Sequence, residues 1–147
     1  MNDYLNAKGW ADIHLYDCKG NLKFSLTKQN LIVQTGKDYL VSKIFENFLT
    51  PQPEITKFTV GSGTTPADLS DTSLENKTGE TTISSYTIES NKMSLFGGLI
   101  QGVGTGTISE LGLETADDVL ISRIVVTTPF QKTVTDFLNI SWSIEVG

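Results

Sequence analysis

The sequence predicts a mainly β protein: an antiparallel β-sandwich of about eight strands with one α-helix packed on it. Three observations support this fold class. Apolar and polar residues alternate in many short segments, which is the period of half-buried strands. Turn residues separate these segments by about 8 to 12 residues, as in sandwiches and barrels. Only one segment shows helical spacing, and a length of 147 residues suits a single domain, 1–147.

The first two strands are predicted on either side of a turn. Alternation runs from 11 to 16 and again from 22 to 27, and the residues DCKGN at 17–21 are typical of a turn. We therefore expect a β-hairpin here. Residues 1–10, which precede the hairpin, are expected to form an N-terminal arm.

The helix is predicted over 36–49. Thr35 can cap its free backbone N–H groups, and Asp38 lies in its first turn, beside the positive end of the helix dipole. The proline at 51 ends it. We expect the apolar face to cover one side or one end of the sheet. That face is made of Leu40, Val41, Ile44, Phe45, Phe48 and Leu49.

Beyond the helix the pattern returns to strands, and the last is the most regular. Its apolar face begins at Val134 and includes Trp142, which we place in the core. Phe137 lies on the polar face, so we expect it to be covered by the helix or by a neighbouring subunit. The longest irregular stretch is 61–79, and a connection of this length is usually a functional loop or a packed cover. The expected strands are 55–60, 81–89, 92–100, 106–114, 119–127 and 132–146.

Charge and composition exclude several classes of protein. The net charge is −6, which argues against direct binding to nucleic acid, because affinity for phosphates depends on Lys and Arg. The single cysteine, Cys18, cannot form an internal disulfide. No secretion signal is evident at the start, and no run approaches the ~20 apolar residues that span a bilayer. We expect a protein made in the cytoplasm that does not bind a membrane.

Catalytic, cofactor and metal sites are not predicted. The only histidine, His14, lies on the polar face of a strand with no motif around it, although nucleophilic catalysis usually needs such a base. The glycines at 102–106 are followed by a strand, whereas phosphate-binding loops lead into a helix. The acidic loop residues do not follow the spacing of a calcium loop, and one Cys with one His cannot supply the four ligands of zinc. We therefore expect that the protein is not an enzyme.

Binding is expected at exposed aromatic residues and irregular loops. An exposed aromatic side chain can stack on a sugar or fill a pocket of a partner. The loops at 61–79 and 101–106 are irregular and carry few charges. The predicted partner contacts are Trp10, Tyr16, Gly61, Ser62, Thr64, Thr65, Pro66, Tyr86, Gly104 and Phe137.

Six motifs follow one another from Leu31 to the end of the chain. LIVQTGKDYLVSKIF is followed by a strand that ends in GSGTTP, then by DTSL, GTISELGL, LISRIVV and DFLNISWSIEV. This order resembles that of small structural proteins of tailed-bacteriophage virions. The motifs are short and rich in Gly and Thr, so their order carries the resemblance.

The resemblance implies a virion protein present in many copies, and it supplies no catalytic residues. The leading expectation is a homo-oligomeric capsid decoration or cement protein, made in the host bacterial cytoplasm and located in the virion. It would stabilise the shell through multivalent contacts with major capsid protein subunits. The alternative is a tail, baseplate or tail-fibre component that contacts neighbouring tail proteins, with a host surface glycan as a ligand.

Overall fold

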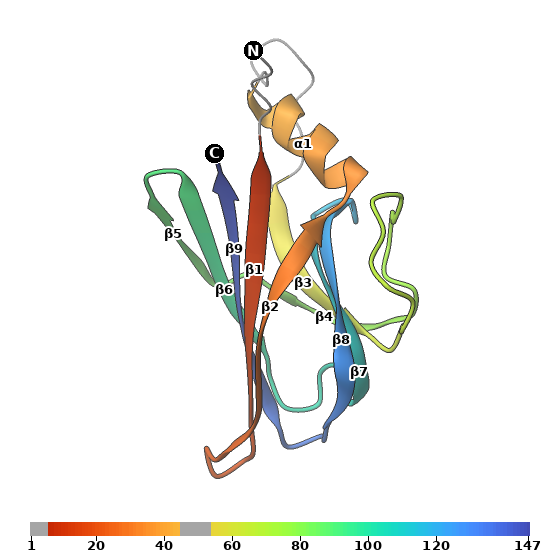
Figure 1. The fold of residues 1–147 in the computed structure, drawn as a ribbon. Helices are drawn as coiled ribbons and strands as arrows, with labels where there is room; N and C mark the ends of the chain where they lie inside the picture. The colour runs from red at the N-terminus through yellow and green to blue at the C-terminus, as the bar shows by residue number, and fades with distance from the viewer. Residues whose placement is uncertain (1–5, 45–53) are drawn as a thin grey trace.

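Nine antiparallel strands and one short helix make up the described part of the chain, residues 6–44 and 54–147, in a computed structural model (Figure 1). This confirms the mainly β class. The elements in chain order are β1 (Ala7–Tyr16), β2 (Leu22–Ile32), α1 (Gln34–Ile44), β3 (Ile55–Gly61), β4 (Lys77–Thr82), β5 (Ser85–Glu89), β6 (Lys92–Leu99), β7 (Gly106–Thr115), β8 (Leu120–Lys132) and β9 (Phe137–Val146).

Hydrogen bonds join all nine strands in one order, β4-β3-β7-β8-β2-β1-β9-β6-β5. The sheet curls into a half-barrel, and α1 lies at one end of it (Figure 1). The two ends of the order approach each other, since the Thr81 hydroxyl on β4 donates to the Gly98 carbonyl on β6 at 2.8 Å. A sandwich of two separate sheets is therefore not confirmed.

The hydrophobic core fills the inside of the curl. β1 and β9 contribute alternate residues to it in register, with Ile13 opposite Ile140. Trp142 is fully buried, as predicted, with its ring 6.0 Å from that of Phe58 on β3. Its indole N–H donates to the Ser122 hydroxyl on β8 at 2.9 Å, so the polar atom of this large side chain is satisfied.

The segment predicted as a single strand at 81–89 forms two strands at opposite ends of the sheet order. The backbone N–H of Ile83 donates to the Thr56 carbonyl on β3, and that of Ser84 donates to the Phe96 carbonyl on β6, each at 2.8 Å. The chain therefore changes its hydrogen-bonding partner between two successive residues. This is why the sheet has nine strands where about eight were expected.

The last strand begins later than predicted. β8 continues to Lys132 and β9 starts at Phe137, so Val134 lies in the turn between them and is 62% exposed instead of entering the core. Asp136 determines the turn: its carboxylate accepts hydrogen bonds from the Thr133 N–H and from Lys23 Nζ, both at 2.7 Å. Because Val134 is apolar, the alternating pattern of the last strand seemed to begin in this turn.

Part of the predicted N-terminal arm belongs to the sheet. Residues 7–10 belong to β1, where they pair with β9 from Ala7 opposite Val146 to Trp10 opposite Ser143. The rest of the predicted arm that the structure describes is Asn6, because residues 1–5 lie outside the described ranges.

The helix packs on β8 through a face that only partly overlaps the predicted one: of the described residues of the predicted face, Leu40 packs against the core. At Gly36 an added Cβ would lie 2.0 Å from the Ile121 carbonyl oxygen, so only glycine allows this approach, and Tyr39 enters the core. Val41 and Ile44, which we expected to be covered, are exposed because they lie on the side of the helix that is turned away from the midpoint of Gly36 and Tyr39. Positions 45–49 of the predicted helix lie outside the described residues.

Candidate functional site

The connection between β3 and β4 lies along β7 and β8, on the side of these strands that faces away from the core (Figure 1). We call residues 62–76 the clamped loop. A buried ion pair lies beneath it: Glu110 on β7 is 0% exposed and Arg123 on β8 is 2% exposed. Arg123 donates to Glu110 Oε2 from Nε at 3.0 Å and from Nη2 at 2.9 Å.

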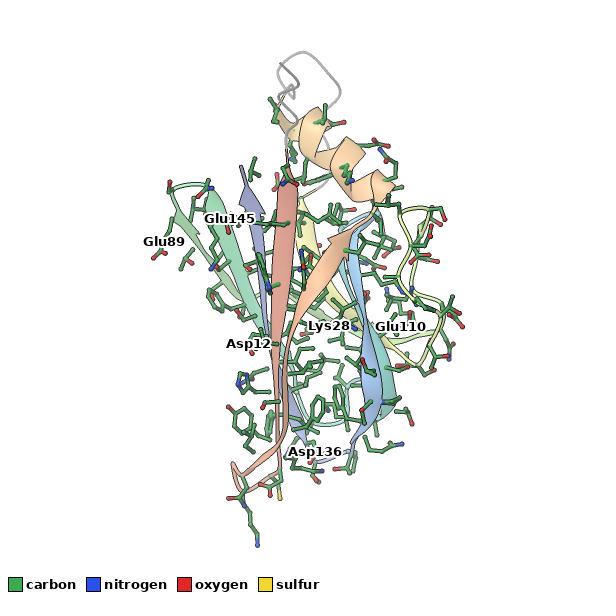
Figure 2. All side chains as sticks on the ribbon, viewed as in Figure 1. Asp12, Lys28, Glu89, Glu110, Asp136 and Glu145 are labelled. Carbon is green, nitrogen blue, oxygen red and sulfur yellow. The ribbon has the colours of Figure 1, made fainter. Side chains whose placement is uncertain are left out.

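The Glu110 carboxylate, labelled in Figure 2, also binds the backbone at both ends of the loop. It accepts N–H donors from Gly63 at 3.0 Å, Glu75 at 2.9 Å and Asn76 at 2.7 Å. Arg123 in turn donates from Nη1 to Asp71 Oδ2 at 2.9 Å, in the middle of the loop. A buried charge is costly unless it is paired and hydrogen-bonded. Here both conditions are met, and the irregular segment is fixed to the sheet.

Apolar contacts and local turns hold the loop further. Leu74 is buried against Val33 and Leu120, in a small cluster separate from the main core. The hydroxyl of Ser70 donates to Asp68, and this hydrogen bond lowers the pKa of the Asp68 carboxyl. The clamped loop is thus a packed cover, which was one of the two expectations for this stretch.

The predicted contacts in this region divide into exposed and buried residues. Thr64, Thr65 and Pro66 are exposed. Thr64 and Pro66 border a groove of about 470 Å³ between the loop, β2 and β8. Ser62 is partly buried and its hydroxyl accepts a hydrogen bond from Asn76 Nδ2 at 2.5 Å. The exposed residues are therefore presented at a fixed position.

Gly61 and Gly104, also predicted as contacts, are buried. An added Cβ at Gly61 would lie 2.3 Å from the Asn76 carbonyl oxygen, and one at Gly104 would lie 2.5 Å from Leu99 Cδ2. Gly104 also has a φ of +64°, which other residues rarely adopt. Both glycines allow close packing, so neither is accessible to a partner.

A second surface lies on the outer side of β1, β9 and β6. Trp10, Asp12, His14 and Tyr16 alternate with buried residues along β1 and face away from the core. Tyr16 is the register partner of Phe137 on β9. The structure therefore brings two of the predicted aromatic contacts together, with Trp10 farther along the same strand. Tyr86 lies apart from both surfaces, exposed on the edge strand β5.

A hollow of about 440 Å³ opens on this outer surface. We call it the β6–β9 hollow. It lies where Gly98 on β6 stands opposite Asn139 on β9, which in turn stands opposite His14 on β1. Phe137 lines it and is 39% exposed, so no described helix or strand covers this ring as one alternative had predicted. The lining of the hollow includes Asp12, His14, Phe96, Gly98, Phe137 and Asn139.

The polar side chains of the hollow have few partners within the protein. The Asn139 amide is exposed and has no hydrogen-bond partner among the described residues. Asp12 accepts one hydrogen bond, from the Thr27 hydroxyl at 2.9 Å, and His14 Nδ1 lies 3.9 Å from the same carboxylate oxygen. These groups retain hydrogen-bonding capacity for a ligand.

Three further carboxylates lie close together, as the ligands of a metal ion would. Oxygens of Glu80, Glu114 and Asp118 lie within 4.8 Å of one another. Lys77 Nζ lies 2.8 Å from Glu80 and 3.3 Å from Glu114, and Lys57 contacts Asp118 and Glu80. Hydrogen bonding to Lys57 lowers the pKa of Asp118, whereas burial raises that of Glu114. The ammonium groups balance these charges, and we assign the group a structural role.

Comparison with protein-family models, curated proteins and solved structures gives no match for this chain. Within 6–44 and 54–147, no helix is long and apolar enough to cross a membrane.

Sequence reasoning missed Glu110 and Arg123. A signal was present, because each is the one charged residue in the middle of a mostly apolar segment, ISELGL and LISRIVV. Lys, Glu, Arg and Asp are almost never fully buried unless paired. Two such positions in neighbouring strands could have predicted their mutual ion pair.

Proposed function

We propose that this chain is a structural protein of a tailed-bacteriophage virion and not an enzyme. In this proposal it is a homo-oligomeric capsid decoration or cement protein that binds major capsid protein subunits and stabilises the shell. The order of motifs from Leu31 onward suggests this class. Shell contacts need exposed surfaces in fixed positions, repeated in many copies, so that modest individual affinities add up.

The observation that carries the proposal is that the clamped loop is already held in one position on the sheet. Ordering a loop on binding costs free energy, and a surface that is already ordered avoids that cost. Glu110 and Arg123 hold the loop in advance, leaving Thr64 and Pro66 exposed beside a groove. We assign these two residues and that groove to the contact with the major capsid protein.

The chemistry of the charged groups agrees with a role without catalysis. The most deeply buried carboxylate, Glu110, is fully used in holding backbone and Arg123. Asp136 is likewise used in a turn. These groups stabilise the fold, whereas the exposed residues of the two surfaces are mostly hydroxyls, amides and aromatic rings.

Binding to purified shells tests the proposal. The protein should bind shells that lack it in fixed stoichiometry and raise their melting temperature. Thr64→Lys should abolish binding, because it places a charged chain at the contact. The matched control is Thr72→Lys, an exposed threonine of the same loop that does not border the groove, and it should bind normally. Equal binding by both variants would remove the groove from the interface.

Copy number separates the leading proposal from the alternative of a tail, baseplate or fibre component. A decoration protein follows the symmetry of the shell and should be present in on the order of hundreds of copies per particle. A component of the tail tip should be present in a handful. Quantitative mass spectrometry of purified particles gives this number directly.

A further inference from the structure

We propose that the β6–β9 hollow binds a neutral saccharide through one sugar ring. This goes beyond the proposed shell function, because stabilising a shell by protein contacts requires no sugar site. Three properties of the hollow lead to this ligand: its shape, its mixture of aromatic and polar side chains, and its charge.

The shape depends on a glycine. Gly98 lies on β6 opposite Asn139, and an added Cβ would lie 3.0 Å from the Leu138 carbonyl oxygen and 3.2 Å from Asn139 Oδ1. The missing side chain leaves an indentation in an otherwise regular sheet surface. Its volume of about 440 Å³ falls within the range of about 300–1,000 Å³ of small-molecule sites.

The side chains match the two kinds of surface on a sugar ring. A pyranose has a face of C–H groups and a rim of hydroxyls, so it needs an aromatic ring beside hydrogen-bonding groups. Phe137 and Phe96 supply the rings. The side chain of Phe137 is entirely apolar, yet it is 39% exposed and can therefore contact a sugar. Asp12 offers an acceptor, and the Asn139 amide offers both donors and an acceptor.

The strands hold these groups in place before a ligand arrives. His14 is opposite Asn139, which is opposite Gly98, so three adjacent strands fix the hollow by their register. Sites on regular strands are held more precisely than sites on loops. A weak, transient ligand such as a single sugar benefits most, because little free energy is spent on ordering the protein.

The charge of the lining selects for neutral sugars. Asp12 is its one acidic residue, and no Lys or Arg is among the residues that line the hollow. Phosphorylated, sulfated or carboxylated sugars would bring a negative charge beside the Asp12 carboxylate without a cation to pair with it, which is unfavourable. An uncharged hexose or N-acetylhexosamine fits this lining.

The test is a titration of the isolated full chain, labelled with ¹⁵N, with six neutral sugars followed by NMR. The probes are glucose, galactose, mannose, rhamnose, N-acetylglucosamine and N-acetylgalactosamine. At least one should give saturable shifts concentrated at the amides of His14, Gly98 and Asn139. If none of the six does so, or if the shifts map elsewhere, the hollow is not a site for a neutral sugar.

Variants distinguish sugar binding in the hollow from nonspecific binding elsewhere on this surface. Asn139→Ala should weaken the best sugar about tenfold, the cost of a lost hydrogen bond, and Phe137→Ala should weaken it at least as much. Trp10→Ala is the matched control, because Trp10 is 37% exposed on the same surface but does not line the hollow. An equal loss in Trp10→Ala would overturn the assignment.

The same variants distinguish this inference from the proposed function. Asn139→Ala and Phe137→Ala should retain shell binding, whereas Thr64→Lys should retain sugar binding. Unchanged amide spectra away from the substituted positions establish that each variant is folded. If Asn139→Ala binds the sugar as well as the parent chain does, the saccharide site is wrong whatever the result with shells.

Discussion

The clamped loop and the β6–β9 hollow hold their backbones in different ways. The loop has no strand ladder, and its backbone depends on Glu110, Arg123 and Leu74. The hollow stands on three paired strands, and the Asn139 amide takes no part in holding them. The loop thus stays ordered through hydrogen bonds to buried side chains of β7 and β8, whereas the strands under the hollow are held by their own ladders and leave the Asn139 amide without a partner among the described residues. The Asn139 amide therefore retains hydrogen-bonding capacity that the Glu110 carboxylate has already used.

The largest expected effect comes from breaking the clamp. Arg123→Met should lower the free energy of unfolding by about 3–5 kcal/mol, because it leaves the Glu110 charge buried without its partner. Urea denaturation measures this change, and limited proteolysis should show new cleavage within 62–76. The control Lys92→Met, at an exposed position, should change stability by less than about 0.5 kcal/mol. A similar small change in Arg123→Met would show that the ion pair does not hold the loop.

A smaller loss is expected from the apolar contact of the same loop. Leu74→Ala should cost about 2–3 kcal/mol, at the lower end for a buried leucine because its cluster has two other members among the described residues. Leu69→Ala provides the comparison within the loop, since Leu69 is 45% exposed and should cost clearly less. Thermal unfolding of the two variants side by side checks the order. Equal losses would mean that the loop is not packed as a cover.

The turn that leads into the hollow should respond to pH. Burial acts to raise the pKa of Asp136, but hydrogen bonds from Lys23 and Thr133 outweigh it and lower the pKa below its usual 3.8. The carboxylate therefore stabilises the fold above that value, and its contribution is lost as the pH falls through the lowered pKa. Asp136→Asn should cost about 1.5–3 kcal/mol at pH 7 and should flatten the decline of stability below pH 3.8.

Urea denaturation at a series of pH values measures the Asp136 effect. Asp117→Asn, in an exposed turn, is the control and should follow the parent chain. A loss in Asp136→Asn that is as large at pH 2 as at pH 7 would assign the effect to packing instead of charge.

The smallest effect is expected in the hollow itself. Asn139→Ala should change the free energy of unfolding by less than about 0.5 kcal/mol, because the exposed amide bonds to no described residue. Differential scanning calorimetry checks this value. A loss above about 1 kcal/mol would mean that the amide supports the sheet, and the contrast between the two surfaces would disappear.

Most strands could be predicted from the sequence because alternation is a local property. The exchange of partners at Ile83 and Ser84 could not, since both flanking strands continue one alternating pattern and the change depends on residues far along the chain. The start of the last strand was predicted too early. Val134 is an apolar residue that fits the alternating pattern, but it lies in a turn that Asp136 stabilises.

The candidate sites were harder to predict than the strands. Tyr16 and Phe137 were recognised singly, but their proximity follows from the register of β1 with β9, which a sequence alone does not provide. The hollow needs in addition the pairing of β6 with β9, which places Gly98 beside Asn139. Gly61 and Gly104 were assigned to binding because a glycine in a loop gives the same signal whether it provides flexibility or close packing.

The change of partner at Ile83 and Ser84 has a consequence for how the sheet comes apart. β4 and β5 lie at opposite ends of the strand order, yet two residues join them. The sheet cannot uncurl unless this short link pulls on the ladder of β3 with β4 or on that of β5 with β6. If either β4 or β5 separates from its neighbour, the link therefore strains the strand pairing at the other end of the sheet. We therefore expect the two edges, which in an open sheet would fray independently, to open together.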